Sequence, residues 1–429
     1  MGNITTVETM LLQACEKVCE EYFRNQSVSA FRKRLLCDFR DRGLLPTKKI
    51  ENWHYTDLKN LLKIFPVNTD ESSLIKEECE CLVAESIKLS IGSPQPLLSA
   101  LQEKGIKVFP FSYIEDKDEK SLCLEPIDEH DAIGYINGIL VQDGYKVVIP
   151  DECQLDVPLE LQSVQRGEQR HLRYPISFGV NSKATVIERY TSLTNQPSLV
   201  SSIADIKVGK GADITWIIVL DQDVEDTHLG QLRVVLEQNA LLKVFFINMG
   251  QGLSRRELSI DVEGEESRFM LRGINLLKGQ THGDLSMFLR HKVPNTSSTS
   301  IVRSIVLEKS TGIFQGAVYV SPESQGSNAT MASNTLLFSN EGNFFVKPEL
   351  EIFADDVQCG HGATVSNINQ DHLYYLMTRN IPKNKAYSML SHAFISEVIS
   401  DLNDEVLQLS IEKLLSSWMD KNNKLYSTI

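Results

Sequence analysis

The chain has 429 residues, enough for two or three domains and a large hydrophobic core. Hydrophobic residues make up 42% of it and charged residues 23%, as is usual for a soluble globular protein. The 57 acidic residues outnumber the 43 basic residues, and the net charge of −14 argues against nucleic acid as the main partner. No apolar run reaches the roughly 20 residues that a membrane-spanning helix needs.

Eight cysteines are scattered along the chain without the spacing of a disulfide framework. In a chain of this length such cysteines are typical of free thiols in a reducing compartment. The first residues, Met1–Glu8, lack the basic region and the long apolar region of a secretory signal. We therefore expect a cytoplasmic protein.

The N-terminal part of the chain is predicted to be mostly helical. Apolar residues recur at helical spacing over residues 5–24 and again over about 28–43, where Gly43 is the expected stop. The segment Leu45–Leu58 then places Trp53 and Tyr55 on either side of a histidine. We expect this segment to pack its two aromatic rings against the rest of the protein and to have a structural role.

From about residue 136 the pattern changes to short strands. Apolar, β-branched runs of about 4–8 residues follow one another from Lys146 to Phe353, each bounded by Gly, Asn, Asp, Ser or Pro. No long helical pattern interrupts them, so a sheet of βαβ units is not expected. Because no exact repeat period is visible, the pattern by itself predicts a large all-β domain that is a sandwich, a barrel or a solenoid.

After residue 368 the pattern becomes helical again. A helix beginning at Asn384 or Lys385 and another at about 404–420 each carry a wide apolar face. These faces either close on each other as a cap or meet a partner. For the first of these helices the face consists of Ala386, Met389, Leu390, Ala393, Phe394 and Val398.

Several catalytic motifs are absent from the sequence. It contains no phosphate-binding loop, no nucleophile elbow, no His-Glu-x-x-His and no dinucleotide-binding fingerprint. We therefore expect a protein that is not an enzyme and has no ATP site. If ATP drives its function, a partner must hydrolyse it.

The run Cys359-Gly360-His361 is the strongest candidate site. If it lies in a strand, the two side chains point to the same face. A thiolate and a neutral imidazole together suit iron, an iron–sulfur cluster or zinc. The alternative is a buried cysteine beside a hydrogen-bonded core histidine. His282 and His291 are weaker candidates of the same kind, since most such histidines are surface or hydrogen-bonded residues.

The sequence around this run resembles a known family. Leu350–Val365, followed by Leu373–Ile381, is similar to the C-terminal part of the SufB/SufD family, the scaffold proteins of the SUF iron–sulfur cluster assembly machinery. Leu45–Leu58 is similar to a segment near the start of SufD-type members. The Cys-x-His-Gly-Ala-Thr run is also of SufD type, and Leu376 stands where SufB-type members carry a cysteine. Asn380 replaces the usual glycine, and asparagine tolerates the left-handed conformation nearly as well.

This resemblance implies a fold and a division of the chain. The fold class is mainly β, with a right-handed parallel β-helix core flanked by N-terminal and C-terminal helical regions. The implied domains are a mostly helical domain at 1–135, the β-helix core at 136–368 and a C-terminal helical domain at 369–429.

The resemblance also implies a function. The chain would be a non-catalytic scaffold subunit of a SufB–SufC–SufD complex, with its β-helix paired to that of SufB and its C-terminal helices bound to the ATPase SufC. His361, and second Cys359, would bind iron or a transient iron–sulfur cluster at the SufB interface, where a SufB cysteine would complete the site. The sequence leaves open whether the chain forms a homodimer when SufB is absent. It also leaves open whether a flavin joins the complex.

Two alternatives follow from the same residues. In the first, the chain is a purely structural adaptor that docks SufC and shapes SufB without binding metal. In the second, it is a β-helix enzyme acting on polysaccharides, which would need clustered acidic residues on one face and usually secretion. The missing secretory signal and the free thiols count against this enzyme.

Overall fold

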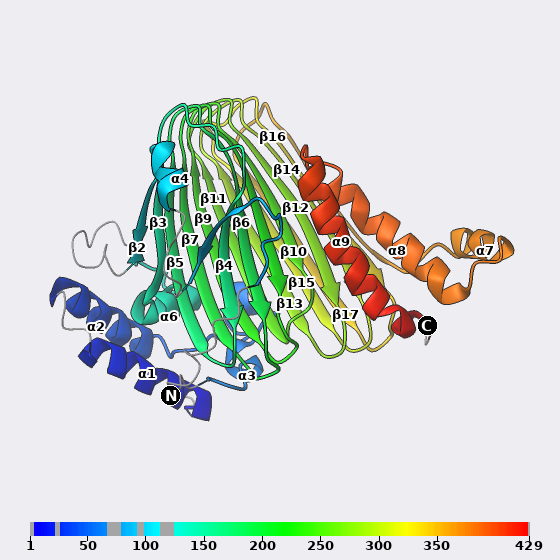
Figure 1. Cartoon of the computed structure of the whole chain (residues 1–429), viewed down its shortest axis with the longest axis horizontal. Helices are drawn as coiled ribbons and strands as arrows, with labels where there is room; N and C mark the ends of the chain where they lie inside the picture. The colour runs from blue at the N-terminus through cyan, green and yellow to red at the C-terminus, as the bar shows by residue number, and fades with distance from the viewer. Residues whose placement is uncertain (1–3, 22–25, 67–78, 92–97, 112–123, 428–429) are drawn as a thin grey trace.

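Two nine-stranded sheets form the centre of the molecule. The computed structural model describes residues 4–21, 26–66, 79–91, 98–111 and 124–427. From β3 onward, consecutive strands alternate between the sheets, so the chain winds into a parallel β-helix flanked by helices at both ends (Figure 1). The expected fold class is confirmed.

Neighbouring strands in both sheets run parallel, except for the antiparallel pair β2 and β3. The first sheet contains, in spatial order, β1 (Ile87–Ser90), β4 (Leu159–Gln165), β6 (Lys183–Ser192), β8 (Asp213–Asp221), β10 (Leu241–Asn248), β12 (Arg268–Leu277), β14 (Ser297–Val306), β16 (Asn328–Leu337) and β18 (Gln358–Ser366). The second contains β17 (Asn343–Ile352), β15 (Thr311–Val320), β13 (His282–His291), β11 (Leu253–Val262), β9 (Thr227–Leu236), β7 (Leu199–Val208), β5 (Gln169–Phe178), β3 (Asp143–Ile149) and β2 (Lys107–Pro110).

Residues at equivalent positions of successive coils lie in register, and the spacing between them varies. One such column of the first sheet consists of Val186, Trp216, Val244, Leu271, Ser300, Met331 and His361, so that successive members are 27 to 31 residues apart. This variation explains why the sequence shows no exact repeat. The strands are also longer than the apolar runs predicted, because polar residues extend each ladder. The run expected at Leu285–Leu289, for example, lies inside the ten-residue β13.

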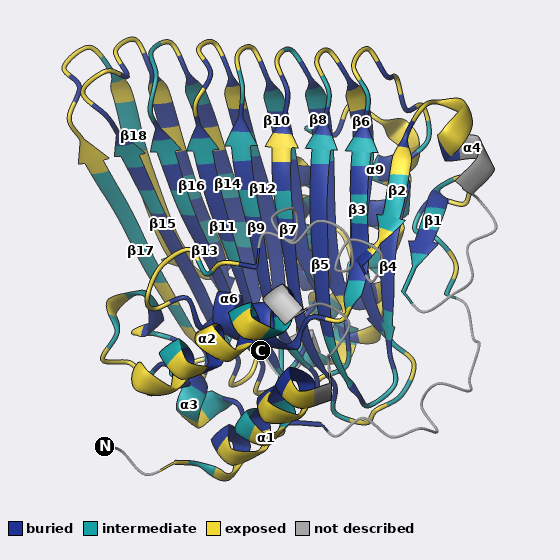
Figure 2. Ribbon diagram, turned by 90° about the vertical axis from the view of Figure 1, so that its left-hand side faces the viewer, coloured by how far each residue is buried: buried dark blue, intermediate teal, exposed yellow. Residues whose placement is uncertain are grey.

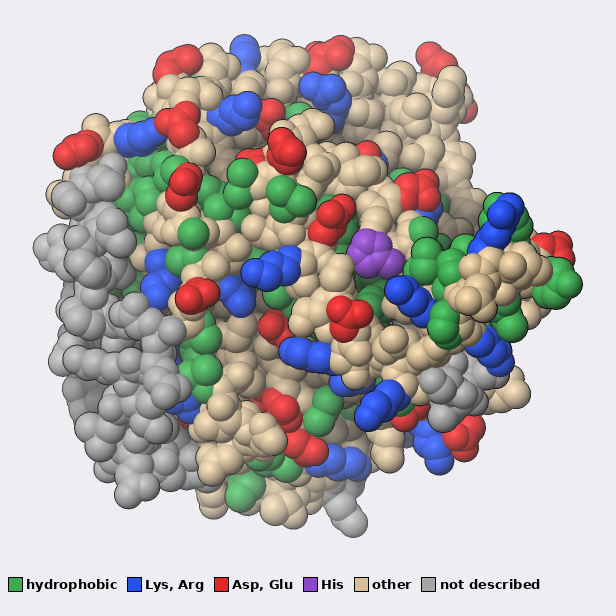
Figure 3. Space-filling model, turned by 45° about the vertical axis from the view of Figure 1, so that its right-hand side comes forward, with side chains coloured by type: hydrophobic (Ala, Val, Ile, Leu, Met, Phe, Trp, Pro, Cys, Tyr) green, Lys and Arg blue, Asp and Glu red, His purple; other side chains and the backbone are tan. Residues whose placement is uncertain are grey.

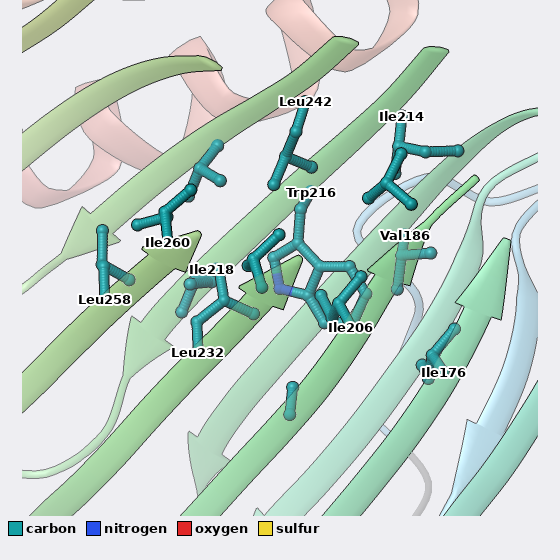
Figure 4. Packing of buried hydrophobic residues seen from close by; sticks show 14 of the residues in the cluster. Ile176, Val186, Ile206, Ile214, Trp216, Ile218, Leu232, Leu242, Leu258 and Ile260 are labelled. Carbon is teal, nitrogen blue, oxygen red and sulfur yellow. The ribbon is translucent and has the colours of Figure 1, made fainter. Parts of the chain in front are cut away.

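The inner faces of the two sheets meet in an apolar core. Because side chains alternate between the faces of a strand, every second residue points into the β-helix. Figure 4 shows Trp216 surrounded by aliphatic side chains such as Ile206 and Ile218. All three side chains are buried. A fully buried aliphatic side chain stabilises the fold by about 1.5–3 kcal/mol, so this continuous core holds the coils together.

A buried ion pair crosses the interior between the two sheets. Arg256 of β11 donates to Glu188 of β6 over 2.7 Å, and both side chains are fully buried. The Glu188 carboxylate also accepts hydrogen bonds from Trp216 Nε1 at 2.9 Å and from the Tyr190 hydroxyl at 2.7 Å. These donors satisfy a charge that would otherwise be costly inside an apolar core.

A ladder of polar side chains follows one inner column of the first sheet. Asn248 Nδ2 donates to Asn275 Oδ1 over 3.2 Å, and Asn275 Nδ2 donates to Ser304 Oγ over 3.4 Å. The next positions in the column are Thr335 and Val365. Within the described residues, Thr335 Oγ1 is buried and has no hydrogen-bond partner, so the ladder ends before the last coil.

The N-terminal helices pack on the outer face of the second sheet. They are α1 (Thr6–Glu21), α2 (Gln26–Asp41), the 3-10 helix η1 (Glu51–Trp53), α3 (Leu58–Leu61) and α6 (Ala132–Leu140); α4 (Leu98–Glu103) lies beside β2. Buried residues of α1, α2 and α6 share one apolar cluster with Ile203 and Leu229 of the sheet. The two predicted N-terminal helices are confirmed over the described residues, and residues 22–24 of the first prediction lie outside them.

The segment 51–56, which we call the N-terminal strap, crosses strands that are far away in the sequence. The Arg255 guanidinium lies 3.9 Å from the Trp53 ring centre and donates to the Asn52 carbonyl over 2.7 Å. Tyr55 stacks on Phe345 of β17 with ring centres 5.0 Å apart. The predicted packing of both aromatic residues is confirmed.

The C-terminal helices cover part of the outer face of the first sheet (Figure 1). They are α7 (Gln370–Thr378), α8 (Lys383–Ile399), α9 (Glu405–Lys421) and the 3-10 helix η4 (Asn423–Ser427). Helix α8 contacts β12 and β14, and Arg303 of β14 pairs with Glu397 over 2.6 Å. Asn380 has a φ of 64°, so the predicted left-handed residue is confirmed.

Two strands lie in the N-terminal region that the sequence predicts to be mostly helical. β1, at residues 87–90, belongs to the first sheet, and β2, at residues 107–110, belongs to the second sheet. The division into domains at 135 and 368 stays a prediction. No helix in the described part of the chain is long and apolar enough to cross a membrane.

Candidate metal-binding site at the open end of the β-helix

The run Cys359-Gly360-His361 lies in β18, the last strand of the first sheet. Cys359 is in register with Ala329 and His361 with Met331, and both of these β16 residues belong to the apolar core. Cys359 also packs against this core. The thiol and the imidazole therefore share the inner face of the β-helix, as the two-residue spacing predicts for a strand.

Cys359 and His361 lie where the core is open. Ala329 and Met331 are only 1% and 3% exposed, because another coil covers them. Beyond β18 the first sheet has no further strand in the described structure, and here Cys359 is half-buried and His361 is exposed. Figure 2 shows this contrast between the buried central strands and the more exposed β17 and β18. The two side chains are therefore accessible to a ligand or partner.

The surroundings of Cys359 favour its neutral form. Partial burial raises the pKa of the thiol above its ordinary value, and a backbone hydrogen bond with Ala329 opposes this increase only in part. The thiolate is the form that binds metals. Cys359 is therefore a poor ligand in the isolated chain at neutral pH, and an approaching cation would favour its ionised form.

The two side chains do not complete a metal site by themselves. Among the described residues, no group of three or more histidine, cysteine, aspartate or glutamate side chains could hold a metal ion. Iron–sulfur clusters and structural zinc use four protein ligands as a rule. A cluster bound at Cys359 and His361 would need ligands from outside the described residues.

The other candidate histidines have hydrogen-bond partners inside the protein. His291 Nδ1 lies 2.7 Å from Thr296 Oγ1, and its Nε2 lies 3.0 Å from Ser298 Oγ. Burial lowers its pKa to about 4, so the ring is neutral at physiological pH. His282 Nε2 lies 3.0 Å from Thr56 Oγ1 of the strap, and burial lowers its pKa as well. Both residues fit the structural interpretation.

The predicted docking face of α8 is divided between two environments. Ala386 and Val398 are buried against the first sheet, and Leu390 and Phe394 pack partly on the same cluster. Met389 and Ala393 instead line a groove of about 790 Å³ between α8 and α9. An amphipathic pattern shows only that a helix face is covered, and here the protein's own sheet covers most of it.

Exposed apolar side chains lie on the helical projection formed by α7 and the start of α8. Tyr374 and Tyr375 are 70% and 57% exposed, and Met377 and Met389 are also exposed. Figure 3 shows hydrophobic side chains gathered on the projection at its right-hand side. The docking residues predicted by number all lie on α8, and they include Met389 but not the exposed residues of α7. The consecutive tyrosines at the start of a helical pattern were the available signal.

A family model and curated relatives match this chain. The model of the SUF system FeS cluster assembly SufBD core domain matches residues 161–394, more than half of the chain. The iron–sulfur cluster assembly protein SufD of Escherichia coli is 26% identical over 86% of this chain and 88% of its own length.

Two other relatives extend the match to both branches of the family. A SufBD family protein of Synechocystis is 24% identical over 87% of both chains. The iron–sulfur cluster assembly protein SufB of Bacillus subtilis is 26% identical over 62% of this chain and 58% of its own length. The matched core contains β5 to β18, and with them the Cys359-Gly360-His361 run at the end of the β-helix. The chain therefore belongs to the SufB/SufD family of iron–sulfur cluster assembly proteins.

Proposed function

We propose that this chain is a SufD-type, non-catalytic scaffold subunit of a SufB–SufC–SufD complex that assembles iron–sulfur clusters. The observation that carries the proposal is the position of His361 and Cys359 on the inner face of the last coil, where the β-helix is open. Iron or a nascent cluster is the cargo of this site. The remaining ligands would come from the SufB-type partner that closes the open end.

His361 is the first ligand in this proposal. Its side chain is exposed, and the neutral imidazole nitrogen of a histidine is a good ligand for iron. Cys359 is the second ligand, and it must lose its proton first. Iron close to the thiol would favour that loss, since metal binding and thiol ionisation are coupled.

The C-terminal helices are the proposed docking site of the ATPase SufC. The groove between α8 and α9 and the exposed tyrosines of α7 together offer a mixed apolar and polar surface. Since the sequence has no phosphate-binding loop, nucleotide hydrolysis in the complex would belong to SufC. The sequence leaves open whether a flavin joins the complex, and the visible absorption spectrum of the purified complex tests it.

A purely structural adaptor is the second candidate function. The raised pKa of Cys359 favours it, because a protonated thiol packed against the core is what a structural cysteine shows. In that case the chain holds SufC and shapes SufB but never contacts iron.

The experiment compares wild type with His361→Ala in co-expressed complexes with SufB and SufC. Anaerobic iron and sulfide analysis measures the cluster loaded per complex. We expect the variant complex to assemble normally and to load at least about tenfold less cluster. His372→Ala is the matched control, because His372 is also exposed but lies on α7.

Two results would contradict the proposal. Normal loading by an assembled His361→Ala complex would favour the adaptor. Failure of that complex to assemble, with a normal His372→Ala control, would make His361 an interface residue and assign the chemistry to SufB.

A further inference from the structure

Two cysteines that lie two residues apart, Cys79 and Cys81, have no part in the proposed function. They belong to the segment of residues 79–82, which precedes β1 and lies on the outer face of the first sheet. Both cysteine side chains are half-buried, whereas Glu80 between them is exposed. Such alternation is typical of an extended chain, in which residues two apart point to the same side.

Hydrogen bonds hold the backbone of this segment on β4 and β6. The Glu80 carbonyl accepts from Arg189 Nη1 at 2.7 Å and from Gln162 Nε2 at 3.3 Å. The Leu82 N–H donates to Glu160 Oε2 over 2.7 Å. The backbone groups of residues 80 and 82 therefore face the same two strands, as they do in an extended chain. The two thiols consequently share one side of the segment.

The spacing of the two cysteines suits a disulfide. An extended chain rises about 3.3 Å per residue, so the Cα atoms of residues two apart are separated by about 6.6 Å. Bridged cysteines have Cα separations of about 4.4–6.8 Å. A disulfide can therefore form here without unfolding the segment. Because the separation is near the upper limit, the bond is strained and easily reduced again.

The surroundings of the pair favour thiol chemistry over metal binding. The Thr191 hydroxyl of β6 donates to Cys79 Sγ over 3.6 Å. A thiolate is the attacking species in thiol–disulfide exchange, and this hydroxyl is placed to donate to it. Among the described residues, no further histidine, cysteine, aspartate or glutamate joins the pair in a group that could hold a metal ion. Structural zinc takes four protein ligands as a rule.

The other cysteines lack one or more of these features. Burial raises the thiol pKa of three of them, which makes them poor nucleophiles: Cys15, Cys19 and Cys153. Cys37 is exposed, but no second cysteine lies two residues away from it. Cys359 belongs to the proposed cargo site, and Cys123 lies outside the described residues.

We propose that Cys79 and Cys81 are a redox-active dithiol, which low-molecular-weight disulfides such as oxidised glutathione convert to an intramolecular disulfide. The Cys79 thiolate attacks one glutathione sulfur, releases the other glutathione as a thiolate and becomes a mixed disulfide. The Cys81 thiolate then attacks Cys79 Sγ and releases the second glutathione thiolate. The dithiol loses two electrons and two protons, and oxidised glutathione gains both as two thiols.

The test places the full-length chain in dilute glutathione buffers of increasing oxidised fraction. Acid quenching, alkylation and peptide mass spectrometry then identify the state of each cysteine. We expect the Cys79–Cys81 disulfide to form at a ratio of oxidised to reduced glutathione at least about tenfold lower than the ratio that modifies Cys37, because its second step is intramolecular.

Two matched variants separate the steps of the reaction. Cys81→Ser should stop at the mixed disulfide on Cys79. Cys79→Ser should react with glutathione at Cys81 more slowly than Cys81→Ser reacts at Cys79, because it lacks the thiol that accepts from Thr191. Circular dichroism melting checks that both variants are folded.

The proposal is overturned if the two cysteines of the wild-type chain end as mixed disulfides with glutathione. It is equally overturned if they stay reduced at the ratio that modifies Cys37. Faster reaction of Cys79→Ser than of Cys81→Ser would overturn the choice of Cys79 as the attacking thiol. None of these outcomes depends on cluster loading, so they are independent of the proposed function.

Discussion

The middle and the last coil of the β-helix place side chains at equivalent positions but give them different surroundings. In the middle, the inner column contains Trp216 and Leu271, and both are fully buried. At the end of the same column lies His361, which is exposed. The Glu188 carboxylate in the middle is paired within the chain with Arg256. The last coil has no neighbour beyond it in the described structure.

In such a fold, the residues available for chemistry lie in the coil that lacks a neighbour. Side chains and backbone groups of a coil in the middle are contacted by the coils on both sides, so few of them are available to a ligand. The last coil repeats the geometry of the others but lacks one neighbour, so its inner residues and its backbone edge are free to bind.

The largest effect is expected from Glu188→Ala in the middle of the β-helix. The substitution leaves the Arg256 guanidinium buried without its carboxylate, which costs about 3–5 kcal/mol. Urea unfolding followed by circular dichroism measures the loss. Glu51→Ala is the control, because it removes an exposed partner of Lys347 and should cost less than about 1 kcal/mol. Equal losses in the two variants would show that burial does not distinguish these pairs.

Lowering the pH should destabilise the middle of the β-helix through His291. Its folded-state pKa is about 4, whereas an unfolded histidine titrates near 6.5. Between these values the unfolded chain binds more protons, so the contribution is complete above about pH 6.5 and is lost as the pH falls toward 4. At pH 5 the loss is about 2 kcal/mol.

The measurement for His291 compares unfolding free energies at pH 7 and pH 5 in wild type and in His291→Gln. The variant should lose about 2 kcal/mol less than wild type over this range, because glutamine does not titrate. An identical pH dependence in the two proteins would argue against a neutral buried His291.

A smaller effect is expected from the polar ladder inside the first sheet. Asn275→Ala removes the acceptor of Asn248 and the donor to Ser304, and we expect a cost of about 1–2 kcal/mol. Thermal unfolding of the variant checks this value. No change in the unfolding midpoint would mean that the ladder contributes nothing beyond packing.

The smallest effect is expected one coil further on, where the ladder has ended. Thr335→Val replaces a buried hydroxyl that has no hydrogen-bond partner among the described residues, and it should stabilise the protein by about 0.5–1 kcal/mol. The same unfolding assay measures it. A loss of stability of similar size would show that the hydroxyl has a partner such as water.

The sequence predicted those features that depend on local patterns. Alternating apolar residues predicted the strands, and the two-residue spacing of Cys359 and His361 predicted their common face. The parallel β-helix was predicted only from the family resemblance, because coils of different length hide the repeat period in the sequence.

Other features could not be predicted because they join distant parts of the chain. Glu188 and Arg256 are 68 residues apart, and nothing in either strand indicates that the other residue compensates its charge. The apolar face of α8 likewise could not reveal that the first sheet covers Ala386 and Val398. The open end that makes His361 accessible depends on which strand comes last.

The N-terminal strap sets an order of events during synthesis. Trp53 packs under Arg255, and Glu51 pairs with Lys347, 296 residues further along the chain. Chains grow at about 5–20 residues per second, so Glu51 is synthesised roughly 15–60 s before its partner. The strap is therefore among the first segments to be synthesised and among the last to find its native contacts. During that interval its aromatic residues are available to chaperones.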